Sequence, residues 1–177
     1  MALTTHLRTK VLILLAAAGS VCVVDQVTKA LAISHFSTDH PSHIVGPLYL
    51  TKLVNDTSSI SYLYQSSLLL EILRLVLIAA VTSLAFYAAH TRVRVLCALV
   101  IGGIISNALD HWTHPAFLVV DFIKVGNIAT FNVADVTVVM GIAGLAVCFV
   151  PFITHPLDFV RARRTTGPAL VPDPLSV

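Results

Sequence analysis

Four apolar segments, each long enough to cross a bilayer as a helix, constrain the fold of this chain more than any other feature. A hydrocarbon core of about 30 Å is spanned by roughly 20 helical residues. Hydrophobic residues make up 56% of the chain, and the mean hydropathy of +0.88 is too high for a soluble domain. The sequence therefore predicts an all-α integral membrane protein with four transmembrane helices in one domain, residues 1–158. The helices are expected at about 11–32, 67–89, 95–112 and 133–155.

The first apolar segment also has features of a signal peptide, because basic residues precede it. It contains the sequence GSVC, which is similar to a lipobox and would make Cys22 a lipidation site. However, Val21 is too large for the position before a lipidated cysteine, and the apolar character continues past Asp25 to Ile33. We therefore interpret this segment as the first transmembrane helix.

Polar segments connect the predicted helices. Residues 34–66 are too polar to span, and residues 49–54 are rich in strand-forming side chains before a break at Asn55. We expect a small extramembrane β-sheet here, lying on the bilayer. Residues 113–133 form a second polar connection, which we expect to be a loop. The tail, 159–177, is basic and then rich in proline, which is typical of a disordered cytoplasmic segment.

The distribution of basic residues predicts the topology. Four crossings place both termini on the same side of the membrane, whereas the loops on the opposite side contain only Lys52 and Lys124. The positive-inside rule therefore predicts that both termini are cytoplasmic. The basic residues on the predicted cytoplasmic side are Arg8, Lys10, Arg92, Arg94, Arg161, Arg163 and Arg164.

Ionisable residues within apolar segments are energetically costly and usually serve a function. With the predicted topology, the carboxylates in or beside the helices all lie at about one depth, in the outer leaflet. Scattered structural residues have no reason to share a depth, so we expect a functional site on the extracytoplasmic side. These carboxylates are Asp25, Glu71, Asp110, Asp121 and Asp135.

The spacing of asparagine and aspartate suggests that two helices face a common cavity. Asn107 and Asp110 are three residues apart and share a helical face, and Asn132 and Asp135 repeat this spacing on the next helix. The glycines at 102–103 give the earlier helix a small-residue face, which allows a neighbouring helix to approach closely.

Two pairs of opposite charge have alternative interpretations. Asp25 and Lys29 are four residues apart on one helical face, and they either neutralise each other near the interface or face a polar site. Glu71 and Arg74 are three residues apart near the start of the second helix, where we favour an interfacial ion pair.

We interpret Asp121 and Asp135 as a catalytic pair at the membrane surface. Two carboxylates held a few ångströms apart share a proton. The ionised member can take a proton from water, and the protonated member can polarise a carbonyl or protonate a leaving amine. This chemistry hydrolyses an amide without a metal or a covalent intermediate. Ser106 is the nearest candidate nucleophile, but no histidine is placed as its obvious base.

Two other kinds of site are compatible with parts of this sequence. His111 and His114, with Asp110 and Asp121, could bind zinc, but there is no HExxH motif and Pro115 ends the helix. A polar seam that stabilises a bundle with a transport or binding role is a further alternative. We expect no metal and no cofactor. A net charge of +2 is too small to suggest a nucleic-acid partner.

Several motifs, in this order and with the four-helix layout, are similar to those of one family. They are DQVTK at 25–29, Asn55 after a strand-like segment, GGIISNALD at 102–110, VVDFI at 119–123 and FNVAD at 131–135. Over about residues 11–155 the chain resembles the lipoprotein signal peptidase (signal peptidase II) family, which are intramembrane aspartyl proteases of bacteria.

The resemblance implies that Asp121 and Asp135 are the catalytic dyad of an aspartic endopeptidase. It implies a diacylglyceryl-modified prolipoprotein as substrate, cut just before the lipidated cysteine to release the signal peptide. It also implies that other residues bind substrate or support the site. These are Asp25, Lys29, Asn55, Asn107, Asp110 and Asn132.

The resemblance further implies a multi-pass protein of the bacterial inner or plasma membrane, with a small extracytoplasmic sheet and a loop over the active site. Its expected partners are prolipoproteins, membrane lipids and inhibitors of the globomycin type, and we expect a monomer. The family requires no metal or cofactor.

The sequence departs from the family pattern in two motifs. The family's GNxxDR is SNALDH here, with His111 in place of arginine, and NxGAAF is NDTSSI, with Thr57 in place of glycine. Histidine is shorter and mostly neutral at pH 7, so an arginine contact to substrate carbonyls would weaken or become pH-dependent. We therefore include His111 among the substrate-binding positions. The alternative function is a divergent paralogue that binds lipidated signal peptides with reduced or no cleavage.

Overall fold

The computed structural model describes residues 2–55, 67–113 and 119–154. The predicted tail, 159–177, and the residues after Asn55 in the NDTSSI motif lie outside the described residues. Residues 1–145 form one compact unit. The second unit begins at Ala146, within the last helix, and the fold and the site discussed below belong to the first.

Each predicted apolar segment forms a helix. The helices are α1 (Ala2–His35), α2 (Ser67–Tyr87), α3 (Thr91–Thr113) and α4 (Val133–Thr154). Three stretches of the described helices are long and apolar enough to cross a membrane, and α2 does not contribute one of them. These three are Leu7–His35, Thr91–Asp110 and Val133–Val150. The first helix is longer than predicted, because the polar residues before the apolar segment continue its helical path.

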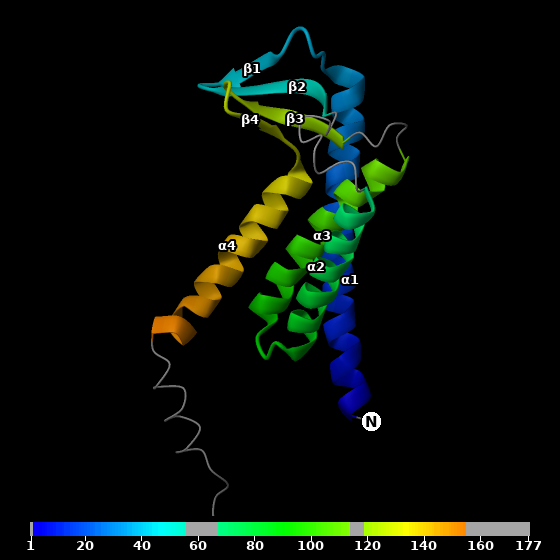
Figure 1. The fold of residues 1–177 in the computed structure, drawn as a ribbon, viewed down its shortest axis with the longest axis vertical. Coiled ribbons are helices and arrows are strands. Elements are labelled where there is room, and N and C mark those ends of the chain that lie inside the picture. Colours follow the sequence, from blue (N-terminus) through cyan, green and yellow to red (C-terminus); the bar gives the residue numbers. More distant parts are fainter. Residues whose placement is uncertain (1, 56–66, 114–118, 155–177) are drawn as a thin grey trace, which may run out of the picture. The chain divides into compact units, whose positions relative to one another are not determined.

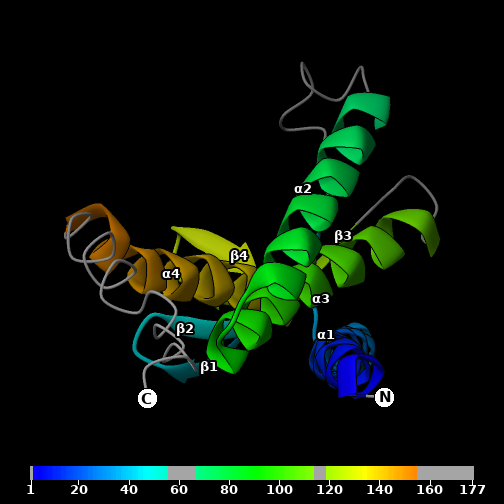
Figure 2. The same ribbon diagram turned by 90° about the horizontal axis from the view of Figure 1, so that it is seen from below.

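Helix α3 packs against both α1 and α2 (Figures 1 and 2). The close approach of α1 and α3 requires the predicted small-residue face. A Cβ on Gly102 would lie only 2.7 Å from the carbonyl oxygen of Ala18 in α1. A Cβ on Gly103 would lie 2.5 Å from the carbonyl oxygen of Ala134, at the start of α4. The two adjacent glycines therefore let α3 contact a different helix on each side.

Two basic side chains hold the carboxyl end of α2. The Arg94 guanidinium donates hydrogen bonds to the carbonyl oxygens of Ala88, at 2.8 Å, and Ala89, at 3.1 Å. The Lys10 ammonium of α1 donates to the carbonyl oxygen of Phe86 at 2.8 Å. The last carbonyls of a helix lack intrahelical partners and carry partial negative charge, so both contacts stabilise this helix end.

The described strands form one antiparallel sheet in the order β1-β2-β3-β4. Strand β2 confirms the strand predicted at 49–54, and it is paired with β1 through a turn at Gly46, whose φ of 53° suits glycine. The bounds are β1 (Ser42–Val45), β2 (Leu48–Asn55), β3 (Val119–Val125) and β4 (Ala129–Phe131).

The connection between α3 and α4, predicted as a loop, contributes half of the sheet. Its segment Val119–Val125 is rich in β-branched residues, which favour strands, and pairs with β2 so that Leu53 lies opposite Asp121. The prediction that Asp121 lies in a loop is therefore wrong. The β-branched residues are a local signal for a strand, but its pairing depends on β2, which is more than sixty residues earlier in the chain.

The close α1–α3 packing predicts different effects for two glycine substitutions. Gly102→Ala should destabilise the protein by about 1–3 kcal/mol, because the added methyl group meets backbone that cannot move aside easily. Gly19→Ala is the matched control in α1, since a Cβ there has no atom within 4 Å. Thermal unfolding in detergent micelles measures both, and equal unfolding midpoints would contradict the packing described.

Candidate active site

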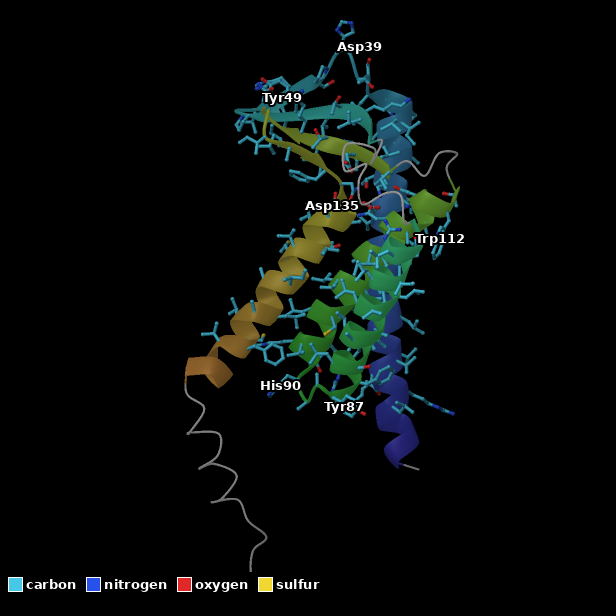
Figure 3. The ribbon with its side chains drawn as sticks, in the orientation of Figure 1. Asp39, Tyr49, Tyr87, His90, Trp112 and Asp135 are labelled. Atoms are coloured by element: carbon cyan, nitrogen blue, oxygen red, sulfur yellow. The ribbon has the colours of Figure 1, made fainter. Side chains whose placement is uncertain are left out.

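The FNVAD segment folds so that Asp135 is turned back over the start of α4. Asn132 caps the helix: its Oδ1 accepts a hydrogen bond from the backbone N–H of Asp135 at 2.9 Å. In return, Asp135 Oδ2 accepts from the backbone N–H of Asn132 at 3.2 Å. This reciprocal arrangement is a capping box, and its three-residue spacing is visible in the sequence. It places the Asp135 carboxylate at the junction of helices and sheet (Figure 3).

The same asparagine reaches the second aspartate. Asn132 Nδ2 donates a hydrogen bond of 2.7 Å to Asp121 Oδ1, and a longer one of 3.4 Å to the backbone oxygen of Val120. Asp121 lies on β3 and is buried. Because Asn132 contacts both carboxylates, the sheet and α4 bring the predicted catalytic pair into a single site.

Asn107 of α3 fixes the other side of Asp135. Its Nδ2 donates to Asp135 Oδ1 at 2.8 Å. Its Oδ1 accepts hydrogen bonds from Lys29 Nζ at 2.8 Å and from Asn132 Nδ2 at 3.2 Å. Two donors on the amide oxygen determine which way the amide points, so its N–H groups face the carboxylate. Asp135 therefore accepts an N–H donor on each of its oxygens.

A buried charge cluster lies directly behind these amides. Lys29 Nζ is 2.6 Å from Asp25 Oδ2 and 2.7 Å from Asp110 Oδ2, and the three side chains are no more than 3% exposed. Asp25 Oδ1 also accepts the backbone N–H of Ala134 at 2.8 Å, in the first turn of α4. Both interpretations of Asp25 and Lys29 therefore hold in part, since they pair with each other and also face the polar site.

The sequence interpretation assigned no role to Gln26, and it rejected Ser106 as a nucleophile without giving it another role in the site. Gln26 Nε2 donates to Asp110 Oδ1 at 2.6 Å and to Ser106 Oγ at 3.2 Å. Ser106 Oγ in turn donates to Asp25 Oδ2 at 2.8 Å, so its hydroxyl supports the charge cluster. A neutral polar side chain within an apolar helix is the available signal for both residues, because such groups in membrane helices commonly bond to a neighbouring helix.

Two predicted site residues can be placed only by their backbone. Asn55 ends β2 opposite Val119, and His111 lies in the last turn of α3. Their side chains lie outside the described part of the structure. The predicted ion pair on α2 is confirmed, since Arg74 Nη1 lies 2.8 Å from Glu71 Oε1.

The zinc alternative loses one of its proposed ligands. Asp110 is held by the Lys29 ammonium and by Gln26. Within the residues 2–55, 67–113 and 119–154, no group of three His, Cys, Asp or Glu side chains is arranged to hold a metal ion. The side chains of His111 and His114 lie outside the described residues.

A cavity of about 410 Å³ gives access to the site from between α2, α3 and α4. Asn107 and Asp135 are the site residues that line it. Two carboxylates held by amide donors, one of them beside a cavity, can activate water and protonate a leaving group. The remaining lining residues are Leu73, Arg74, Leu77, Ile104, Val138 and Val139.

Comparison with known proteins identifies the family. The family model described as "Signal peptidase (SPase) II" matches residues 17–151. The chain is 32% identical over 124 residues to a lipoprotein signal peptidase of Caldicellulosiruptor bescii, covering 70% of this chain and 81% of the relative. It is 30% identical over 142 residues to a lipoprotein signal peptidase of Rhodococcus jostii, covering 77% and 71% of the two chains.

The fold is also similar to a solved structure described as a bacterial membrane enzyme. The TM-score is 0.68 at 22% identity, and the match covers 80% of this chain and 92% of that one. At this identity the match concerns the fold, which agrees with helices packed beside a small sheet.

The buried cluster predicts that Lys29→Met will be strongly destabilising. Removing the ammonium leaves two buried carboxylates without their cation, a change that typically costs about 3–5 kcal/mol. The triple variant Lys29→Met, Asp25→Asn, Asp110→Asn should recover part of this loss, because it removes the uncompensated charges as well. Unfolding midpoints in micelles test this, and a Lys29→Met variant as stable as the unaltered protein would contradict the burial of the cluster.

Proposed function

The chain belongs to the signal peptidase II family, and on that premise we propose that it removes signal peptides from bacterial prolipoproteins with Asp121 and Asp135 as its catalytic pair. One observation carries the assignment of these residues. Asn132 donates hydrogen bonds to both carboxylates, from its side chain to Asp121 and from its backbone to Asp135. No other pair of described carboxylates combines this connection with access to the cavity.

The proposed reaction is amide hydrolysis by an aspartate pair. The ionised carboxylate takes a proton from water, and the water oxygen attacks the scissile carbonyl, which the protonated carboxyl group polarises. Collapse of the tetrahedral intermediate breaks the C–N bond, and a proton passes to the leaving amine. Asn107 and Asn132 keep the carboxylates in place, and Lys29 keeps Asn107 in its orientation.

The substrate proposed in detail is a prolipoprotein whose cysteine already carries diacylglyceryl, cut immediately before that cysteine. The motifs VVDFI and FNVAD, and the relatives named lipoprotein signal peptidase, support this proposal. Binding of globomycin-type inhibitors, contact with membrane lipids and a monomeric state are part of the same proposal.

We place four spans in the bilayer, with both termini cytoplasmic and the site toward the extracytoplasmic side. Three helices suited to crossing and the uneven distribution of basic residues support this topology. Two exposed aromatic residues agree with it: Tyr87 is 90% exposed at the end of α2, and Trp112 is 62% exposed near the end of α3 (Figure 3). Aromatic side chains are enriched at both membrane interfaces.

The proposed catalytic pair predicts that Asp121→Asn and Asp135→Asn each reduce cleavage at least a hundredfold, because neither amide can exchange the proton. Purified protein and a diacylglyceryl-modified prolipoprotein provide the assay, with Asp39→Asn as the control at an exposed carboxylate far from the site (Figure 3).

Substantial cleavage by either site variant would contradict the assignment. Loss of activity in EDTA, restored by zinc, would favour a metal-dependent hydrolase instead. Binding of the substrate by the unaltered protein without cleavage would favour the divergent paralogue.

A further inference from the structure

A second groove lies between α1, α2 and α3, toward the other end of the helices from the candidate active site. Leu14 of α1 and Ile101 of α3 are buried in it, whereas Leu15 and Gly19 of α1 are exposed at its edge. Most of its lining is apolar. An apolar groove accepts many kinds of hydrocarbon, so the charged groups at its end determine the class of ligand.

Two basic side chains meet at one end of this groove. Phe86 of α2 lines the groove, and the Lys10 ammonium donates to its carbonyl oxygen at 2.8 Å. The Arg94 guanidinium donates to the carbonyl oxygens of Ala88 and Ala89, which directly follow α2. Both cations are therefore held at the carboxyl end of the helix that forms one wall of the groove.

The register of α1 and α3 places these cations at one level. Contacts between the two helices advance along both chains together, from Ala18 against Gly102 to the cluster around Lys29. Lys10 and Arg94 each precede the Ala18–Gly102 contact by eight residues, about 12 Å along the helix axis. The two cations thus form one cluster, and the groove extends from it toward the middle of the helices.

This cluster carries more positive charge than its known partners neutralise. The carboxyl end of a helix has about half a negative charge, so two cations on it leave roughly 1.5 positive charges uncompensated. Within residues 2–55, 67–113 and 119–154, neither Lys10 nor Arg94 belongs to an ion pair. On each of the three helices the nearest carboxylate is roughly four turns away. These carboxylates are Asp25 on α1, Glu71 on α2 and Asp110 on α3.

The two cations also have hydrogen-bonding capacity left. Lys10 is half-buried, and an ammonium group has three N–H donors, of which the bond to Phe86 uses one. Arg94 is only 5% exposed, and its Nε has no hydrogen-bond partner among the described residues. The backbone carbonyls therefore do not satisfy this cluster fully, and Lys10 is the member that can reach a ligand.

We propose that this site binds an anionic phospholipid, with its phosphate group at Lys10 and one acyl chain in the groove along Leu14 and Ile101. The cations require an anion and the groove requires a hydrocarbon, and a phospholipid joins the two in one molecule. Phosphate oxygens are strong acceptors for charged donors, and basic pockets between membrane helices are typical sites for anionic lipid head groups.

The site does not depend on the proposed reaction. Figure 3 shows Tyr87 and His90, beside the carboxyl end of α2, at the opposite end of the helices from Asp135. The topology proposed above places this end on the cytoplasmic side, so the lipid belongs to the cytoplasmic leaflet. The binding chemistry itself is the same in either leaflet.

The charged end is tested with Lys10→Gln. Native mass spectrometry of the full chain in micelles measures binding of phosphatidylglycerol and of phosphatidylcholine with the same acyl chains. We expect the unaltered protein to bind phosphatidylglycerol at least tenfold more tightly. Lys10→Gln should lower this affinity about tenfold, because a charge-assisted hydrogen bond is lost. The control is Arg92→Gln, which removes an exposed cation at the same end of the helices and should change the affinity less than twofold.

The apolar part is tested with Gly19→Leu. Gly19 lines the groove, and a Cβ there has no atom within 4 Å, so the larger side chain enters the groove without a clash. We expect the affinity for phosphatidylglycerol to fall about fivefold, because the side chain takes the place of the acyl chain. The control is Ser20→Leu, at the next position of α1, which is exposed and does not line the groove.

Thermal unfolding in the same micelles gives an independent measurement. A ligand that binds only the folded protein raises its unfolding midpoint. Phosphatidylglycerol should therefore stabilise the unaltered protein and Arg92→Gln, and it should stabilise Lys10→Gln much less. This comparison also shows whether each variant is folded.

Four results would overturn the proposal. The first is equal affinity for the two lipids, and the second is an equal loss of affinity in Lys10→Gln and Arg92→Gln, which indicates diffuse attraction. The third is stabilisation by inorganic phosphate alone as large as that by phosphatidylglycerol. The fourth is binding that occurs only after Asp158→Asn and Asp173→Asn, since carboxylates of the chain's own tail would then be the occupants.

Discussion

The arrangement of the site depends on the Lys29 ammonium group. It lies buried between Asp25 and Asp110 and also donates to the amide oxygen of Asn107. Each acidic partner connects it to another element, because Asp25 accepts a backbone N–H of α4 and Asp110 belongs to α3. One cation therefore holds three helices in register and orients the amide beside Asp135. Burying such a cluster costs desolvation energy, so its persistence requires all these contacts together.

The sheet positions Asp121, which the helices alone cannot do. Asp121 lies on β3, whose long pairing is with β2, a strand from the segment that follows α1. The pairing brings two distant connections together over the start of α4, where Asn132 spans the remaining gap between the two aspartates. Two elements therefore set the geometry of the two aspartates: the capped start of α4 holds Asp135, and the paired strand β3 carries Asp121.

Much of this arrangement follows from local sequence patterns. Apolar length predicts the helices, the three-residue spacing of Asn132 and Asp135 predicts their shared face, and strand propensity predicts β2. What could not be predicted depends on contacts between distant segments. The pairing of β3 with β2, and the role of Gln26 beside Ser106, are set by tertiary packing and leave only weak local signals. The side chains of Asn55 and His111 lie outside the described residues, so their predicted roles stay predictions.

The central claim is that Asp121 and Asp135 act as one catalytic unit rather than as two independent contributors. Single-turnover cleavage of a lipidated prolipoprotein by the double variant Asp121→Asn, Asp135→Asn, compared with each single variant, tests this most directly. Groups that act as a unit are non-additive, so the double variant should be no slower than the slower single variant. Losses that multiply in the double variant would contradict the account.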